Sequence, residues 1–132
     1  MSYILDSNSL FELPRDGGRR DDLAVITEVY EEYALTELRR NHIRRLGIKV
    51  LQPQLRHFQK LKEVILTHGT NLDLISLRKN KGTADVLILA YILSERDAPE
   101  TLFPNDYILI TKDATLAEVA DAFDIKHLGE LP

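Results

Sequence analysis

The chain has 132 residues, no cysteine and a formal net charge of −4, and 44% of its residues are hydrophobic. We expect one domain of ordinary size, with enough apolar side chains to build a core without metals or disulfides. The lack of cysteine excludes disulfide scaffolds, zinc–thiolate sites and cysteine nucleophiles. The negative balance argues against nucleic-acid binding by overall charge alone, although it leaves room for a local basic groove.

The distribution of apolar residues argues against membrane association and export. No apolar run reaches the roughly 20 residues that span a bilayer. Residues 1–10 also lack the basic segment and the long apolar segment of a secretory signal. We therefore expect a soluble, cytoplasmic protein in which residues 1–132 form a single domain.

Strand and helix patterns alternate along the whole chain. Short, nearly all-apolar runs predict strands over residues 3–5, 23–26, 48–51, 107–110 and 125–128. Apolar residues at steps of three and four predict helices over residues 28–43, 54–67, 72–77, 86–93 and 116–123. We expect residues 7–9 to form a polar turn and Thr27 to cap the next helix. The alternation predicts a three-layer α/β/α sandwich with a central parallel sheet.

Carboxylates occupy three of the junctions between these elements. Asp6 ends the first strand and Asp113 follows the fourth. Both should project into the crevice beyond the carboxyl ends of the sheet if their strands are neighbours. Asp85 lies in the first turn of the most apolar helix, where the positive helix N-terminus by itself favours an acid. The helix after the second strand carries several glutamates, most of which we expect to be solvated surface charges.

Four short segments, taken in this order, resemble the motifs of PIN-domain nucleases, nearest to the VapC-type toxin ribonucleases. The segments are Tyr3–Leu10, Ile26–Tyr33, Gly82–Asp85 and Leu109–Leu116. The resemblance covers nearly the whole chain and implies a PIN-like fold. One departure is Thr83, where the family often has a glutamate, so a supporting carboxylate at that position is missing.

The resemblance implies a metal-dependent endoribonuclease, with a crevice that holds Mg²⁺ or Mn²⁺. The implied catalytic and metal-binding residues are Asp6, Glu32, Asp85 and Asp113. Two unit charges about 4 Å apart repel by about 4 kcal/mol at an effective dielectric of about 20, so gathered acids need a cation or must share protons. Oxygen ligands suit Mg²⁺ and Mn²⁺, and a bound ion can activate the attacking water.

The helical glutamate of the site has two candidates. Glu32 fits the family position because it lies three residues after Val29 and just before Tyr33, and Glu31 is the alternative. Adjacent helical residues point about 100° apart, so only one of the two glutamates can readily face the crevice.

Other polar residues near the acids are candidates for supporting roles. Donors to the carboxylates or to phosphate are expected among Ser7, Asn8 and Thr111, whose alternative roles are turn formation and capping. A groove for RNA phosphates is expected at Arg78, Lys79 and Lys81, whose alternative role is solvated surface charge. The four histidines show no metal-ligand spacing, so we expect surface or capping roles for most of them.

The toxin resemblance further implies a homodimer and a protein antitoxin. The main rival hypothesis is a non-catalytic α/β module for RNA binding, signalling or assembly. A receiver-like signalling domain needs an aspartate after a middle strand, whereas the strand over residues 48–51 is followed by Gln52 and Pro53. The chain also lacks the Gly-x-x-x-x-Gly-Lys phosphate loop and the Gly-x-Ser-x-Gly nucleophile elbow.

Overall fold

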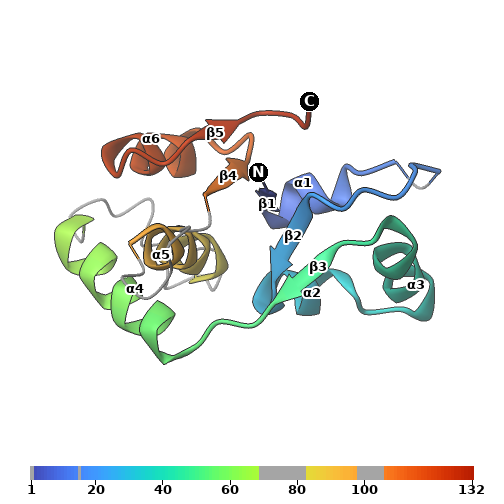
Figure 1. The fold of residues 1–132 in the computed structure, drawn as a ribbon, viewed down its shortest axis with the longest axis horizontal. Coiled ribbons are helices and arrows are strands. Elements are labelled where there is room, and N and C mark those ends of the chain that lie inside the picture. Colours follow the sequence, from blue (N-terminus) through green and yellow to red (C-terminus); the bar gives the residue numbers. More distant parts are fainter. Residues whose placement is uncertain (1, 15, 69–82, 98–105) are drawn as a thin grey trace.

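The strands form one five-stranded parallel sheet in the order β3-β2-β1-β4-β5 (Figure 1). The computed structural model describes residues 2–14, 16–68, 83–97 and 106–132. Its strands are β1 (Ser2–Leu5), β2 (Leu23–Ile26), β3 (Lys49–Leu51), β4 (Tyr107–Ile110) and β5 (His127–Leu128). Its helices are α1 (Ser7–Phe11), α2 (Thr27–Tyr33), α3 (Glu37–Leu46), α4 (Leu55–His68), α5 (Thr83–Arg96) and α6 (Ala114–Ala122).

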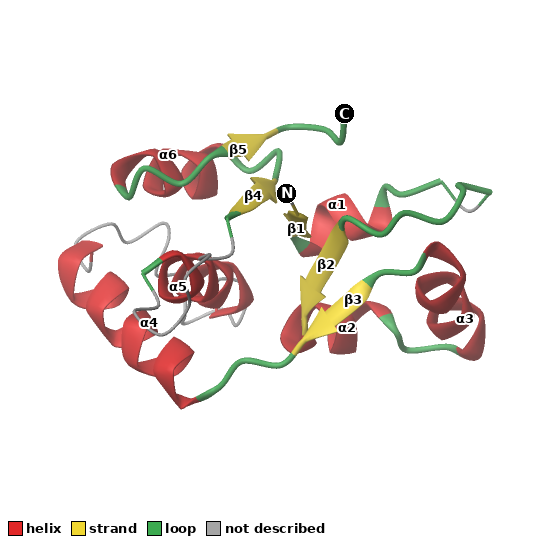
Figure 2. Ribbon diagram, in the orientation of Figure 1, coloured by secondary structure: helices red, strands yellow, loops and turns green. Residues whose placement is uncertain are grey.

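Helices cover both faces of the sheet, which confirms the predicted three-layer α/β/α architecture. Figure 2 shows α4 and α5 on one side of the strands and α1 and α3 on the other. Helix α5 is the central core element, because Val86–Leu93 is buried without a break. The apolar strands explain the parallel arrangement, since Leu23–Ile26 is buried along its whole length.

The direction of strand addition reverses between β1 and β4. Strand β1 pairs with β2 on one side and with β4 on the other. After β3 the chain returns to the opposite side of β1, where β4 and then β5 are added. In open α/β sheets, ligands bind in the crevice at such a reversal, beyond the carboxyl ends of the strands. Asp6 follows β1 and Asp113 comes shortly after β4. Because β1 and β4 are neighbouring strands, both acids lie at the carboxyl ends of adjacent strands, as the sequence analysis required.

The first half of the chain departs from the sequence prediction in three places. Residues 7–9 belong to helix α1 rather than to a turn. The single helix predicted over 28–43 is two helices, because α2 ends at Ala34 and the Thr36 side chain caps α3 by accepting from the Arg39 N–H at 3.2 Å. Thr27 is the first residue of α2 and not its cap; its hydroxyl donates to the Leu51 carbonyl at 3.1 Å.

Other boundaries shift less. The last strand is His127–Leu128, shorter than the predicted 125–128, and α6 begins at Ala114 because Asp113 caps it. The helix predicted over 72–77 lies outside the described residues. None of the helices in the described ranges is both long and apolar enough to cross a membrane.

A buried polar pair joins α4 to α5 at the end of α5 far from Asp85. His57 is only 1% exposed; its Nδ1 accepts from the Gln54 N–H at 2.8 Å, so Nε2 carries the proton and donates to Glu95 at 2.9 Å. Burial lowers the pKa of His57, which favours this neutral form. The ring therefore caps the start of α4, which is one of the two roles expected for the histidines. It is buried and so does not have the other expected role, a place on the surface.

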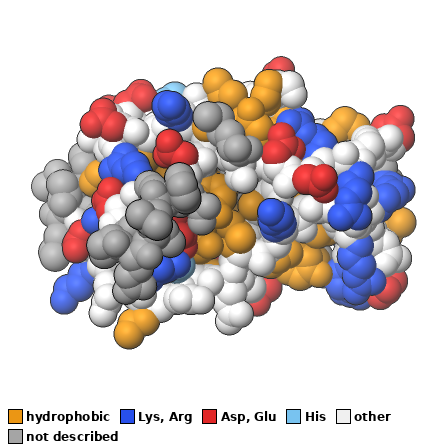
Figure 3. Space-filling model, viewed as in Figure 1, with side chains coloured by type: hydrophobic (Ala, Val, Ile, Leu, Met, Phe, Trp, Pro, Cys, Tyr) orange, Lys and Arg blue, Asp and Glu red, His pale blue; other side chains and the backbone are white. Residues whose placement is uncertain are grey.

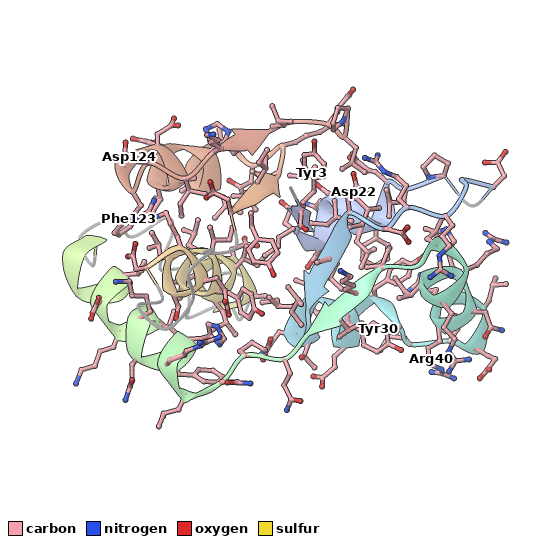
Figure 4. The ribbon with its side chains drawn as sticks, in the orientation of Figure 1. Tyr3, Asp22, Tyr30, Arg40, Phe123 and Asp124 are labelled. Carbon is pink, nitrogen blue, oxygen red and sulfur yellow. The ribbon has the colours of Figure 1, made fainter. Side chains whose placement is uncertain are left out.

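The C-terminal end of α5 is tied to the end of α6. The Arg96 guanidinium donates to the carbonyl oxygens of Phe123 at 2.9 Å and Asp124 at 3.4 Å (Figure 4). Asp124 adopts a positive φ of 57°, so this turn needs local support. Two sets of polar contacts, from Glu95 and from Arg96, therefore fix the C-terminal turn of α5 against α4 and against the end of α6.

Gly47 provides a test of the fold, because it ends α3 at a φ of 73°. An alanine Cβ there would lie 3.1 Å from Cγ of Arg19 and 3.3 Å from the Arg20 carbonyl oxygen. We expect Gly47→Ala to lower the free energy of unfolding by about 1–2 kcal/mol in denaturant titrations. Gly18→Ala is the control, since no atom lies within 4 Å of a Cβ at that position. Equal stabilities of the two variants would contradict the assignment of Gly47.

Candidate active site

Asp6 is the buried carboxylate at the reversal point of the sheet. It is only 3% exposed and its Oδ1 accepts from the Ser9 N–H at 2.8 Å, which caps α1. Its Oδ2 accepts from the Thr111 hydroxyl at 2.5 Å. The Asp6 N–H donates to the Ile110 carbonyl at 3.3 Å, which continues the β1–β4 ladder by one bond. Buried carboxylates require such partners, because an unpaired buried charge is costly.

Thr111 links the two aspartates that follow β1 and β4. Its hydroxyl donates to Asp6 and accepts from the Asp113 N–H at 3.0 Å. The Oδ1 atom of Asp113 in turn accepts from the N–H groups of Thr115 and Leu116 at 2.9 and 3.1 Å, which caps α6. One buried hydroxyl therefore sets the positions of both carboxylates relative to the sheet.

Glu32 reaches the same edge from α2. Its Oε2 accepts from the Ser7 hydroxyl at 2.7 Å, across the packed pair α1 and α2. Glu31 is exposed and makes no hydrogen bond or ion pair in the part of the chain that the structure describes. The geometry therefore favours Glu32 over Glu31 as the helical acid.

Asp85 is the acid whose pKa is affected by the charges of the other three. It lies in the first turn of α5, and its pKa is raised to about 7. Burial is the largest cause, followed by the negative charges of Asp6, Asp113 and Glu32, in that order. The four acids come from four elements far apart in the sequence, so only the folded chain brings them within interaction range.

The acids do not form a ready-made metal site. Within residues 2–14, 16–68, 83–97 and 106–132, no three Asp, Glu or His side chains are arranged to hold one ion. The donor chemistry nevertheless fits a hard divalent cation, because all four groups are carboxylates that repel one another. A cation near Asp85 would favour its ionised form and relieve that repulsion.

The supporting residues differ in what the structure reveals. Ser7 and Thr111 donate to Glu32 and Asp6, as expected of donors to the acids. Asn8 is exposed on α1, and its side chain makes no hydrogen bond with any described residue. The basic residues Arg78, Lys79 and Lys81 lie outside the described residues.

Sequence reasoning missed the part played by Ser9. This buried residue gives its N–H to Asp6 and its hydroxyl to the Ile110 carbonyl at 3.0 Å, so the first turn of α1 is bonded to both β1 and β4. The available signal was Asp6 itself, because aspartate is a preferred N-cap residue, although the Glu or Gln that completes a capping box is replaced here by Ser9. The short run was interpreted as a turn because five residues are too few to show helical periodicity.

Comparison with known protein families finds no family model that matches this chain, and comparison with curated proteins finds no match either.

The raised pKa of Asp85 makes the stability of the metal-free protein depend on pH. Its ordinary value is 3.8 and its folded value about 7, so between these values the folded state binds more protons than the unfolded state. The contribution of Asp85 to the free energy of unfolding therefore falls as the pH rises from about 4 to 7, and is constant above that.

At pH 7.5 in EDTA, we expect Asp85→Asn to have a higher melting temperature than the unmodified protein. The corresponding increase in the free energy of unfolding should be on the order of 1–3 kcal/mol. The difference should shrink as the pH falls towards 4. Asp16→Asn is the matched control, because it removes the same charge from an exposed aspartate with no partner among the described residues. Melting curves that give Asp85→Asn no advantage over Asp16→Asn at pH 7.5 would contradict the repulsion at Asp85.

Proposed function

We propose that the protein is a PIN-type endoribonuclease that uses Mg²⁺ or Mn²⁺ to hydrolyse RNA phosphodiester bonds. The proposed metal-binding and catalytic carboxylates are Asp6, Glu32, Asp85 and Asp113. The observation that carries the proposal is that Asp6 and Asp113 follow neighbouring strands where the strand order reverses, and that their charges and that of Glu32 raise the pKa of Asp85. This is the place in an open α/β sheet where a ligand is expected.

The hydrogen-bond inventory supports a role in cation binding. Oδ2 of Asp113, Oε1 of Glu32 and both carboxyl oxygens of Asp85 accept no hydrogen bond from any described residue. Asp6 has both oxygens engaged, yet each carboxylate oxygen has a second lone pair to offer. The site therefore retains oxygen ligands that folding alone has not used.

The proposed roles of the residues follow from their partners. A divalent ion, when bound, would lower the pKa of a water molecule and stabilise the leaving oxygen. Thr111 holds Asp6 at the carboxyl end of β1, and the Ser7 hydroxyl on α1 donates to Glu32 on α2. Asp85, whose pKa is raised to about 7, would hold a cation in its ionised form together with the other acids. No side-chain nucleophile is required.

The alternative is a non-catalytic RNA-binding or assembly module on the same fold. One observation favours it, namely that no three acidic or histidine side chains in the described ranges are placed for a single ion. Such a module would bind RNA equally well with and without divalent metal and would leave it intact. The resemblance of the four motifs and the repulsion at Asp85 lead us to prefer the nuclease.

The proposal extends to location and partners. A ribonuclease of this kind would act in the cytoplasm, as a homodimer, and its activity would be held in check by an antitoxin protein. Arg78, Lys79 and Lys81 remain proposed contacts to RNA phosphates. A double substitution, Arg78→Ala with Lys79→Ala, should flatten the salt dependence of RNA binding if they do so.

The first functional prediction concerns metal dependence. We expect the purified protein to cut RNA in the presence of Mg²⁺ or Mn²⁺ and to stop when EDTA is added. Asp85→Asn should lower the cleavage rate by at least about a hundredfold, because it removes a charge that the metal site needs. Gel analysis of RNA incubated with each protein tests this. Cleavage that persists after thorough chelation would refute the metal mechanism.

The second functional prediction separates the two neighbouring glutamates. We expect Glu32→Gln to lower the cleavage rate by about a hundredfold and Glu31→Gln to have little effect, because only Glu32 contacts Ser7 and acts on Asp85. Ser7→Ala should fall between them, with a loss of about tenfold, which is typical of a residue that orients a metal ligand. The opposite order of the glutamate variants in rate measurements would exclude Glu32 from the site.

A further inference from the structure

Helix α3 concentrates positive charge in an acidic chain. It carries Arg39, Arg40, Arg44 and Arg45 against one acid, Glu37, although the net charge of the whole protein is −4. Figure 3 shows Lys and Arg side chains gathered over this end of the molecule. A local excess of this kind attracts polyanions that the rest of the surface repels.

The four arginines are not equally engaged. Arg40 donates to Glu37 at 3.0 Å and to the Ala34 carbonyl at 3.2 Å, so it braces the turn between α2 and α3 (Figure 4). Arg44 donates to Asn41 at 3.2 Å. Arg45 is exposed and has no hydrogen bond or ion pair with any described residue. Its guanidinium is therefore available to an external anion.

An aromatic pair lies beside these arginines. The rings of Phe11 on α1 and Tyr33 on α2 meet edge to face, with centroids 5.0 Å apart. The guanidinium carbon of Arg39 lies 5.1 Å from the Phe11 centroid and 5.5 Å from that of Tyr33. Phe11 is nevertheless 49% exposed, which is unusual for a large aromatic side chain.

These residues line a groove of about 640 Å³ between α1 and α3, here called the α3 groove. The members used in the argument are Phe11, Tyr33, Leu38, Arg39 and Arg45. The groove has a mixed lining, with aromatic and apolar side chains beside arginines. Such a surface offers stacking platforms and anion contacts in the same place.

The α3 groove adjoins the candidate active site. On α1, Phe11 lies one helical turn after Ser7, the residue that donates to Glu32. On α2, Tyr33 is the residue directly after Glu32. The groove and the Ser7–Glu32 contact therefore share helices α1 and α2.

We propose that the α3 groove binds single-stranded RNA, with an unpaired base stacked on Phe11 and phosphates held by Arg39 and Arg45. This inference rests on the proposed ribonuclease function and assigns the path of its substrate. Arginine suits the phosphate contacts because its planar guanidinium binds phosphate oxygens in pairs. Unpaired bases suit an exposed aromatic ring, whereas the bases of a duplex are already stacked on one another.

The charge of the groove favours RNA over a protein partner. Leu38 is 69% exposed at the rim, and exposed leucine with arginine also occurs in protein interfaces. A protein partner would need an acidic surface to match the arginines, while any RNA strand carries the required charge at every nucleotide. The α3 groove thus provides the anion contacts that the carboxylate site itself cannot make.

The test is RNA binding by the full chain in EDTA, which prevents cleavage. A labelled single-stranded RNA is titrated by fluorescence anisotropy over a range of KCl concentrations. We expect the double variant Arg39→Gln with Arg45→Gln to reduce the slope of log affinity against log salt by about 1.4, since each lost phosphate contact removes about 0.7. Phe11→Leu should weaken binding about tenfold and leave the slope unchanged.

Three controls make the result specific. Lys62→Gln removes an exposed charge from α4, at the other end of the longest axis, and should leave affinity and slope unchanged. Binding of duplex RNA should be insensitive to Phe11→Leu. Melting curves of every variant identify losses that come from misfolding, and the Phe11→Leu result is read only from protein that melts like the unmodified chain.

The outcomes separate this inference from the proposed function. Unchanged slope in the arginine variant together with unchanged affinity in Phe11→Leu overturns the groove, even if the unmodified protein cuts RNA with Mn²⁺. Groove-dependent binding without any cleavage supports the groove and overturns the nuclease. If Leu38→Ser instead changes the mass of the protein in solution while the arginine variants bind RNA normally, the groove is a contact between protein copies and the inference is wrong.

Discussion

The hydrogen bond from Thr111 to Asp6 is the contact on which the candidate site depends. It joins the carboxyl ends of β1 and β4, the two strands between which the order of the sheet reverses. The same hydroxyl positions Asp113, and Asp6 in turn starts α1, which carries Ser7 towards Glu32. One threonine hydroxyl therefore links Asp6 to Asp113, and Asp6 is linked through α1 to the Ser7–Glu32 contact.

Asp85 has a different role, because its carboxylate accepts no hydrogen bond from a described residue and its pKa is raised by the charges of the other three acids. Its raised pKa reflects burial and repulsion by the other three carboxylates. The fold accommodates this repulsion because Val86–Leu93 of α5 is buried in the core. Functional sites commonly carry strain of this type, and the surrounding packing offsets it. A bound cation would offset the repulsion between the carboxylates. The repulsion at Asp85 is therefore consistent with the proposed metal dependence.

An acidic protein that acts on a polyanion needs its charges separated in space. Here the carboxylates gather at the carboxyl edge of the sheet, while α3 carries four arginines at one end of the molecule. The Arg39 guanidinium on α3 lies over the rings of Phe11 and Tyr33. In the proposed function, this separation keeps the arginines that would attract RNA apart from the carboxylates that would bind a cation.

The sequence by itself determined the class of fold and singled out Asp6, Glu32, Asp85 and Asp113, whose charges act on one another in the folded chain. Apolar strands without alternation indicated burial on both faces, and this pattern survives folding because it reflects the local need to cover each strand. The sequence also favoured Glu32 over Glu31, because of its spacing to Val29 and Tyr33. The hydrogen bond from Ser7 to Glu32 supports that choice. The short helix α1 and the break between α2 and α3 were not predicted, because caps and a single helical turn leave little periodic signal.

Only the tertiary structure decided which charges act on one another. Asp6 and Asp85 are separated by most of the chain, so their interaction depends on the pairing of β1 with β4 and on the docking of α5. The α3 groove likewise joins Phe11, Tyr33 and Arg39 from three helices, and no sequence pattern distinguishes these arginines from an ordinary solvated helix face. Local patterns report the burial and periodicity of each element, whereas electrostatic interaction and groove formation depend on distances through space that only the packed chain defines.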